Sequence, residues 1–221
     1  MKVGYFGDSW CGCKPKDGGQ PFSWPYETTK ILGCESNHYC LSGTHLFNAW
    51  LELSKHIDEV DYVVLTISDP YRFPNDYQIP TMSCGWDKSI ARYTFGEGTT
   101  KKYGDFVELY YRFFSREFMR IAQKGLLQHI DDFIAEKNKP CLVLPGFENS
   151  MQGYEFKNAA FLETDLSSGI KYKRFDKTKP IANHLNEKEN NVLAQAVADF
   201  IKGEYKTGKI SFKKYFEYLD N

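Results

Sequence analysis

Residues 1–10 read MKVGYFGDSW, and this stretch determines the fold that we expect. A short apolar strand at residues 3–6 runs directly into Gly7, Asp8 and Ser9. Gly7 permits a sharp turn, and the Asp8 side chain can hydrogen-bond to the backbone of that turn. Ligands of open α/β sheets bind at the carboxyl edge of the strands, which is where this turn would present Ser9. An ordinary strand-to-loop turn has the same residues, so the rest of the chain must decide between these interpretations.

Length and composition favour one soluble α/β domain. The 221 residues are enough for one well-buried domain and few for two. A net charge of −1 gives no electrostatic reason to expect nucleic acid or an anionic membrane as a partner. Aromatic residues make up 16% of the chain, and such a surplus is typical of grooves and interfaces.

The cysteines are expected to be reduced. No apolar signal segment follows Lys2 and no run approaches 18 apolar residues, so we expect synthesis in the cytosol and no membrane association. The cytosol keeps thiols reduced, so all six cysteines are expected as thiols. They are Cys11, Cys13, Cys34, Cys40, Cys84 and Cys141.

Zinc is a second interpretation of the first four cysteines together with His38. Their spacing, C-x-C followed by C-x5-C, matches no closed structural zinc site. We therefore expect metal-free cysteines and no cofactor.

Several short segments have strand character. Residues 60–67 (VDYVVLTI) and 140–144 (PCLVL) are apolar runs typical of strands buried on both faces of a parallel sheet. Weaker patterns predict strands at 28–32 and 160–164, whereas the polar segment 34–41 is expected to be irregular.

Apolar residues at helical spacing predict three main helices, at residues 44–55, 106–137 and 187–202. Thr44 is the expected N-cap of the first helix, and Gly125 is expected to kink or split the second. Asn186 and Glu189 form a capping-box pattern at the start of the third, and Gly203 follows its end.

Strands that alternate with helices predict a three-layer, doubly wound parallel sheet. We place one domain at residues 1–203, with an irregular insertion at 70–104. Residues 204–221 are expected to form an amphipathic helical extension. A long connection without clear elements is usually functional, so 70–104 and 204–221 are the segments expected to contact a protein partner.

Candidate catalytic residues follow from this sheet. Serine hydroxyls need a neighbouring base, and His184 lies two residues before Asn186, at the start of a helix expected near the same sheet edge as Ser9. The positive end of that helix disfavours imidazolium and would keep the base neutral. Gly43 and Ser68, at the ends of other elements, offer donors for an oxyanion. Each of these residues also has an ordinary structural interpretation as a turn or capping residue.

Taken in order, these pieces resemble the SGNH (GDSL-like) hydrolase superfamily, and most of all SGNH-type proteins encoded by bacteriophages. Residues 7–9 (GDS) match the nucleophile block, 42–44 (SGT) the oxyanion glycine, 66–69 (TISD) the Gly-x-Asn-Asp block, and 183–186 (NHLN) the catalytic-histidine block. The resemblance spans roughly residues 2–202 and is carried by these short blocks.

The resemblance implies a flavodoxin-like, SGNH-type sheet and a serine-dependent ester hydrolase. The substrate class would be a small-molecule or carbohydrate ester that carries an acyl or acetyl group. Ser9 would be the nucleophile and His184 the base, with Ser9, Gly43 and Ser68 around the oxyanion.

Two positions depart from the family pattern. Ser68 stands where the family has asparagine, and Ile181 stands where the triad aspartate is expected. Asp176 is the candidate for that third member if the intervening loop folds back. These departures leave open a rival function, a structural or binding scaffold without efficient catalysis, for example in a virus particle. A zinc-dependent module is a third.

Overall fold

Six parallel strands form the central sheet of the protein in a computed structural model that describes residues 1–12, 23–41, 43–72, 115–169, 185–203 and 205–216. The strand order is β2-β1-β3-β4-β5-β6, and every neighbouring pair is parallel. The first five strands follow the order of flavodoxin-like sheets, which confirms the doubly wound fold class. The strands are β1 (Lys2–Gly7), β2 (Glu35–Cys40), β3 (Tyr62–Ile67), β4 (Cys141–Pro145), β5 (Ala160–Leu162) and β6 (Gly208–Ile210).

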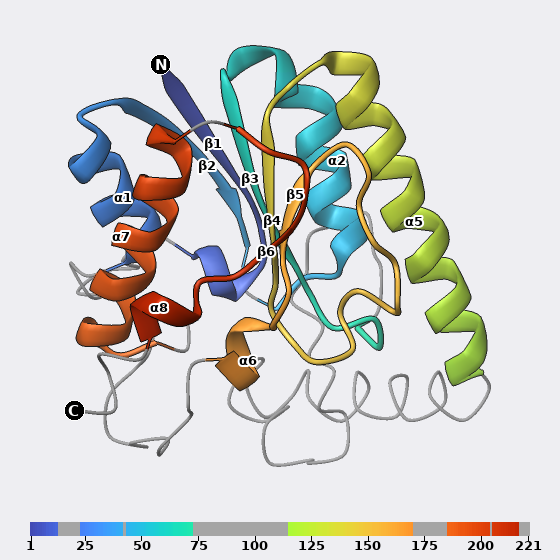
Figure 1. Ribbon diagram of the computed structural model, residues 1–221. Coiled ribbons are helices and arrows are strands. Elements are labelled where there is room, and N and C mark those ends of the chain that lie inside the picture. The colour runs from blue at the N-terminus through green and yellow to red at the C-terminus, as the bar shows by residue number, and fades with distance from the viewer. Residues whose placement is uncertain (13–22, 42, 73–114, 170–184, 204, 217–221) are drawn as a thin grey trace, which may run out of the picture.

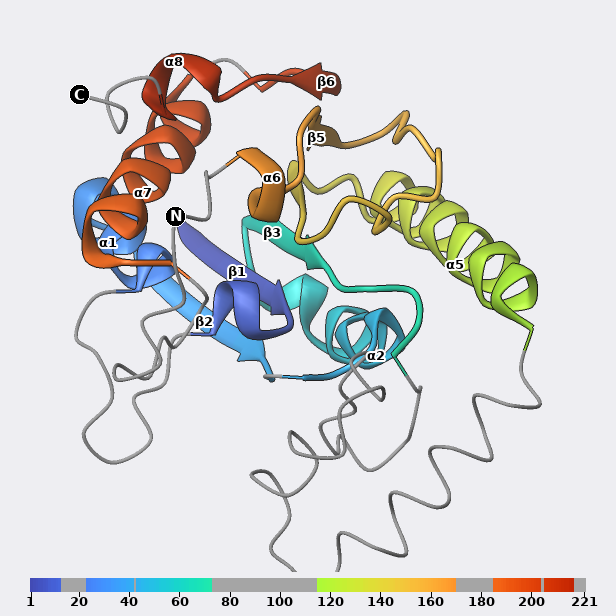
Figure 2. The same cartoon turned by 90° about the horizontal axis from the view of Figure 1, so that it is seen from below.

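Helices cover both faces of the sheet (Figures 1 and 2). One face carries α1 (Trp24–Leu32), α7 (Glu187–Lys202) and the short α8 (Lys213–Phe216). The other face carries α2 (Leu46–His56) and α5 (Arg116–Lys137). Three single turns complete the described elements: η1 (Ser9–Cys11), η2 (Ile57–Glu59) and α6 (Leu166–Gly169).

Each face of the sheet has its own hydrophobic core, because side chains alternate along every strand. Val3 and Tyr5 of β1 belong to the cluster under α1 and α7, whereas Phe6 belongs to the cluster under α2 and α5. The strands predicted at 60–67, 140–144 and 160–164 are β3, β4 and β5, with ends shifted by one or two residues. All side chains of β3 are buried, as the apolar run predicted.

Two predictions between residues 23 and 41 are wrong. Residues 28–32 belong to helix α1, not to a strand, because Pro25 favours the first turn of a helix whose Trp24 and Thr28 pack against α7. The polar segment 34–41 contains strand β2, which pairs with β1 along its whole length. As the edge strand of the sheet, β2 is only partly buried and therefore needs no apolar run.

Helix ends and continuity also differ in two places. The N-cap of α2 is His45 rather than Thr44. Helix α5 continues through Gly125 without a break over 22 residues, so Gly125 does not split the helix. Its described start is Arg116, and residues 106–114 of the predicted helix lie outside the described residues.

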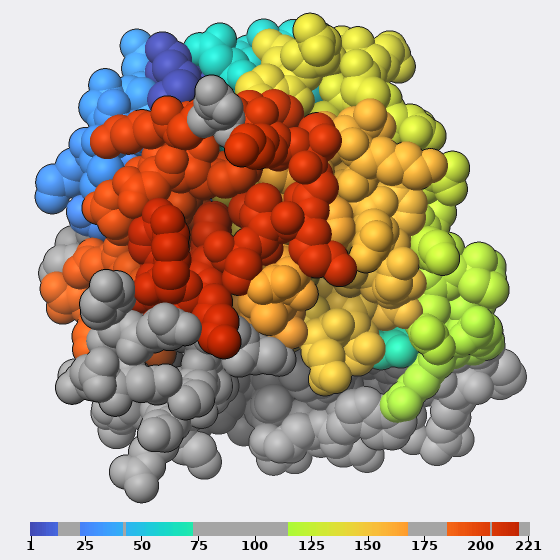
Figure 3. All heavy atoms as spheres, in the orientation of Figure 1, coloured from blue at the N-terminus to red at the C-terminus, as the bar shows by residue number. Residues whose placement is uncertain are grey.

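The C-terminal part combines confirmed and unpredicted elements. Asn186 and Glu189 form the predicted capping box of α7, and Gly203 is its C-cap. Beyond it, the segment 204–221, expected to be helical from its sequence, contains strand β6, which extends the sheet next to β5, and the described helix in it is limited to α8. Figure 3 shows this C-terminal segment lying across one face of the molecule beside α7. Among the described helices, none is long and apolar enough to cross a bilayer.

Candidate active site

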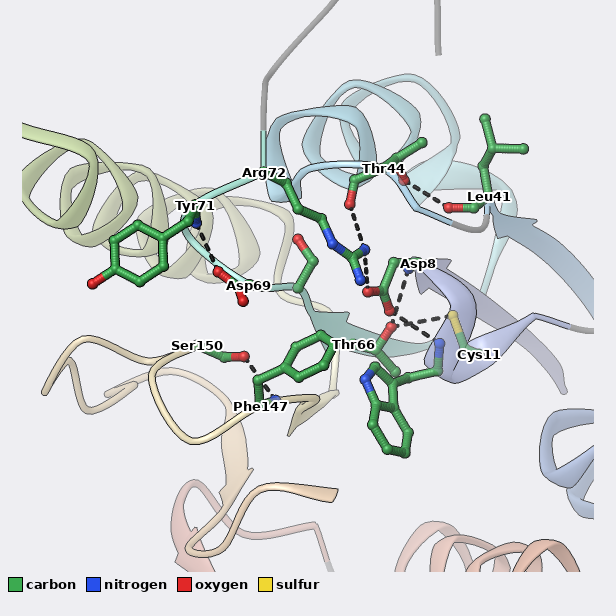
Figure 4. A network of polar contacts seen from close by, with 12 residues as sticks. Asp8, Cys11, Leu41, Thr44, Thr66, Asp69, Tyr71, Arg72, Phe147 and Ser150 are labelled. Atoms are coloured by element: carbon green, nitrogen blue, oxygen red, sulfur yellow. Dashed lines mark hydrogen bonds and ion pairs between the residues drawn. The ribbon is translucent and has the colours of Figure 1, made fainter. Parts of the chain in front are cut away.

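The carboxyl ends of β1, β2, β3 and β4 bring four loops together at one edge of the sheet (Figure 4). Strand β1 lies between β2 and β3, so the chain leaves β1 toward β2 and then crosses back to form β3. This reversal is the topological switch point, where doubly wound proteins bind their ligands. Ser9 follows β1, Gly43 follows β2 and Ser68 follows β3, so all three lie at this edge.

The turn after β1 holds Ser9 in a fixed backbone geometry. Asp8 Oδ1 accepts a hydrogen bond from the Trp10 N–H at 3.1 Å, and Ser9 lies in the single turn η1. Gly7 has φ of 143°, and a Cβ atom there would lie 1.9 Å from Thr66 Oγ1. Only glycine fits this close approach of β1 to β3. The Ser9 residue is buried, with 7% of its surface exposed.

Trp10 anchors the same turn from the other side. Its carbonyl accepts a hydrogen bond of 2.6 Å from Trp24 Nε1, and its ring packs edge-on against Phe147 at 5.7 Å. A Cβ atom on Gly146 would lie 2.5 Å from Trp10 Cδ1, so the indole sits directly on the backbone after β4. The position of Ser9 is therefore tied to the sheet and to α1.

A buried ion pair closes the site between two loops. Arg72 Nη1 donates to Asp8 Oδ2 at 2.6 Å and to the Thr44 carbonyl at 2.9 Å. The guanidinium also lies over the ring of Phe147, 5.3 Å from its centroid. Figure 4 shows Arg72 pointing from its loop toward Asp8 and Thr44. Arg72 thus connects the loops that follow β1, β2, β3 and β4.

His45 lies beside this ion pair and is neutral in the folded protein. Its Nδ1 accepts a hydrogen bond of 3.0 Å from the Phe47 N–H, which requires an unprotonated Nδ1. Burial lowers the pKa of His45 to about 4, and the charge of Arg72 adds to this, while a hydrogen bond to the Pro70 backbone opposes it. His45 is therefore a capping residue for α2 over the neutral pH range.

Ser68 provides a free donor at the end of β3. Its Oγ is buried and has no hydrogen-bond partner within the described part of the chain. Its carbonyl accepts from Gln123 Nε2 at 3.1 Å, and the same nitrogen donates to the Ser150 carbonyl at 3.0 Å. Gln123 of α5 thereby fixes the backbone of Ser68 while leaving its hydroxyl available.

The prediction of six free thiols is wrong, because Cys11 and Cys40 form a disulfide. The physical reason is the register of the sheet: Gly7 pairs with Cys40, and η1 brings Cys11 back to the end of β2, so that the two Cα atoms lie 5.9 Å apart. The pairing removes two of the proposed zinc ligands. Cys34 and Cys141 are free, whereas Cys13 and Cys84 lie outside the described residues.

His184 and Asp176 also lie outside the described residues, so their contacts with Ser9 stay predictions. The chain is described again from Leu185, which is fully buried in the same hydrophobic cluster as Trp10.

A chain of hydrogen bonds leads from this point back to the Ser9 turn. Asn190 donates to the Leu185 carbonyl at 3.1 Å and accepts from the Trp24 N–H at 2.8 Å. Because Trp24 Nε1 in turn donates to the Trp10 carbonyl, three hydrogen bonds connect the residue after His184 to the residue after Ser9.

Three features of this site were missed at the level of sequence. Arg72 and His45 carry no motif, and their contacts join residues far apart in the chain, such as Arg72 and Asp8. The disulfide follows only once β2 is recognised as the neighbour of β1. Arg72 could have been identified as a candidate from its position four residues after Ser68, in the loop that follows β3 at the carboxyl edge of the sheet.

Comparisons with known proteins show distant structural similarity only. No protein-family model matches the chain, and no curated protein matches it in sequence. An acetyl xylan esterase structure aligns with 100% of this chain and 83% of its own at 13% identity, with a TM-score of 0.37. A lipase/acylhydrolase from Enterococcus faecalis aligns with 96% of this chain and 76% of its own at 12% identity, with a TM-score of 0.35. Similarity at this level assigns no residue and no activity, and the fold follows from the strand order.

Proposed function

We propose that the protein is a serine-dependent ester hydrolase with Ser9 as its nucleophile. The observation that carries the proposal is the position of Ser9, in a constrained turn at the switch point of the sheet. Gly43 lies at the same edge, and so does the Ser68 hydroxyl, which has no hydrogen-bond partner among the described residues. Acyl transfer needs a nucleophile and preorganised donors at one place, and this edge offers both residue types.

In the proposed reaction, His184 removes the hydroxyl proton as Ser9 Oγ attacks the carbonyl carbon of the ester. The carbonyl oxygen becomes negatively charged and is held by the Ser9 and Gly43 N–H groups and by Ser68 Oγ. When the C–O bond to the alcohol breaks, His184 returns the proton to the leaving alcohol. Water then attacks the acyl-serine by the same route, which releases the acid and restores Ser9.

The proposed substrate is an ester of a small molecule or a carbohydrate, with an acyl or acetyl group that is transferred to Ser9. Asp176 is the proposed third member of the site and would orient the imidazole of His184. A third member mainly fixes the histidine tautomer and stabilises the imidazolium, so a dyad retains part of the activity.

One observation favours a different function, that of a binding scaffold in a larger assembly such as a virus particle. Ser9 is buried, with 7% of its surface exposed, and a nucleophile must be reached by its substrate. A scaffold would keep the turn for its structural contacts, with Trp10 and the disulfide as the reason for its geometry.

Hydrolysis of p-nitrophenyl esters with short acyl chains distinguishes these functions. Wild type should turn over, and Ser9→Ala should reduce kcat to the uncatalysed background with an unchanged Tm. Ser54→Ala, which removes an exposed helix hydroxyl from α2, is the matched control and should leave kcat unchanged. A wild-type rate equal to that of Ser9→Ala across several esters and acetylated sugars would favour the scaffold.

The role of Ser68 can be separated in the same assay. If Ser68 Oγ donates to the oxyanion, Ser68→Ala should lower kcat by about ten- to a thousandfold with little change in KM. Ser68→Asn should keep or raise activity, since the amide can direct a donor to the same point. An unchanged kcat in Ser68→Ala would remove this hydroxyl from the proposed site.

A further inference from the structure

We infer that Arg72 is a positioning residue that holds the Ser9 turn and the loop before α2 in one relative geometry. The inference rests on the proposed function, because it concerns how the nucleophile and the oxyanion glycine are aligned. It assigns a role to a residue that carries no catalytic motif.

The first support is the placement of a single nitrogen atom. Arg72 Nη1 contacts both Asp8 Oδ2, at 2.6 Å, and the Thr44 carbonyl, at 2.9 Å. Asp8 directly precedes Ser9, and Thr44 directly follows Gly43. One donor therefore bridges the immediate neighbours of the proposed nucleophile and of the proposed oxyanion glycine.

The second support is that Arg72 is itself held in place. Its backbone N–H donates to the Asp69 carbonyl at 3.3 Å, which anchors the residue in the loop after β3. Its guanidinium lies over Phe147, from the loop after β4. The residue is 5% exposed, so the side chain has little freedom to swing into water.

The third support is the cost of burying this pair. Arginine and aspartate are rarely buried this deeply, and a buried ion pair contributes little net stability compared with apolar side chains of similar size. We therefore attribute this buried pair to the geometry that it specifies, the alignment of two loops, rather than to stability.

Alignment of these loops matters for the proposed chemistry. Oxyanion donors act only within hydrogen-bond distance of the developing charge, and misplacement by about 1 Å can lower a rate by about a hundredfold. Loss of the Arg72 bridge should therefore affect kcat more than KM, since the ester itself need not contact Arg72.

The test must separate positioning from charge neutralisation. Arg72→Met alone leaves Asp8 as an unpaired buried carboxylate and destabilises the fold. The double variant Arg72→Met/Asp8→Asn removes both charges, and the amide oxygen of the introduced asparagine can still accept from the Trp10 N–H. Arg120→Met, which removes an exposed guanidinium from α5, is the matched control.

Amide hydrogen exchange and the kinetics of ester hydrolysis together test the positioning role of Arg72. Amide hydrogen exchange in the double variant should be at least tenfold faster in both segments 6–12 and 41–47, with β4 unchanged. Its kcat on a p-nitrophenyl ester should fall at least tenfold with KM within about twofold, and Arg72→Lys should recover part of the rate. Arg120→Met should match wild type in both measurements.

Unchanged exchange in segment 41–47, or a wild-type kcat in the double variant, overturns the positioning role. If wild type hydrolyses no ester above the Ser9→Ala background, the proposed function fails, and exchange in the two segments alone then decides whether Arg72 couples them.

Discussion

Two buried aspartates, Asp131 and Asp8, satisfy their carboxylates in different ways. Asp131 of α5 accepts from the Tyr154 hydroxyl and from the Lys157 and Asn158 N–H groups, at 2.8–2.9 Å. These partners are neutral and come from one connection, between β4 and β5. Asp8 instead accepts from the next turn of its own chain and from a buried guanidinium in another loop.

We interpret this difference as a division between polar groups that serve the fold and polar groups that serve the proposed site. Asp131 attaches a single loop to a helix, and uncharged donors suffice for this. Asp8 lies where four strands end, and its partner Arg72 also contacts the loop before α2. We therefore expect changes at Asp131 to act on stability alone, and changes around Asp8 to act on stability and activity together.

The largest effect on stability is expected from Asp131→Ala. The change leaves two backbone N–H groups and the Tyr154 hydroxyl without their acceptor, so the free energy of unfolding should fall by about 4 kcal/mol. Urea unfolding measures this, with Asp132→Ala, at the exposed neighbouring position, as the control. The kcat per folded molecule should not change, and a lower kcat would contradict the distinction between the two aspartates.

Acid should lower the stability of the folded protein through His45, which lies beside the Asp8–Arg72 ion pair. The pKa of His45 is about 4 in the folded protein, below the ordinary 6.5, so the unfolded chain binds the proton more tightly. The resulting stability is complete above pH 6.5 and is lost as the pH falls toward 4, by about 3 kcal/mol in total.

The variant His45→Asn isolates this effect, since asparagine also caps helices and does not titrate. Urea unfolding at pH 7 and pH 4.5 should show a smaller loss of stability on acidification in His45→Asn than in wild type. Equal losses would show that His45 titrates normally in the folded protein.

The disulfide between Cys11 and Cys40 also ties the turn that contains Asp8 to the end of strand β2. Cys11 and Cys40 are 29 residues apart, and losing the cross-link of a loop of this size lowers stability by about 3.6 kcal/mol in the chain-entropy description. Reductant should therefore lower the Tm of wild type but not that of Cys11→Ser/Cys40→Ser. Thiol titration of denatured, non-reduced protein should find no more than four thiols, and a count of six would refute the disulfide.

The smallest effect is expected from Gly125→Ala, on the helix that carries Asp131. The helix is continuous there, and a Cβ atom at this position meets nothing within 4 Å. Replacing a glycine in a helix interior with alanine should raise the free energy of unfolding by about 1 kcal/mol. Gly7→Ala is the opposite control, since its Cβ would lie 1.9 Å from Thr66 Oγ1. A loss of stability in Gly125→Ala would contradict the open space that the structure shows at this position.

The sequence predicts the parts of this fold that local patterns encode. Strand β3 is a continuous apolar run because helices cover both of its faces, and the capping box of α7 is encoded by Asn186 and Glu189. The Gly-Asp-Ser turn indicated the edge of the sheet correctly, because Gly7 is required by the close approach to Thr66.

Tertiary contacts decide the parts that the sequence did not reveal. The β-branched residues of α1 favour a strand, but Thr28 and Thr29 donate to carbonyls four residues earlier within the helix. Strand β2 is polar because it is the edge strand, and its identity depends on pairing with β1. The Asp8–Arg72 pair joins residues 64 positions apart, and no local pattern reports such a contact.

Labelling with a fluorophosphonate probe tests the central claim, that Ser9 is an activated nucleophile, most directly. Such probes react with serines whose hydroxyl is activated by a neighbouring base. An activated Ser9 should give one adduct per folded chain, mapped by mass spectrometry to Ser9, and none in Ser9→Ala or in denatured protein. Folded wild type that remains unlabelled, or that is labelled at another serine, would contradict this claim.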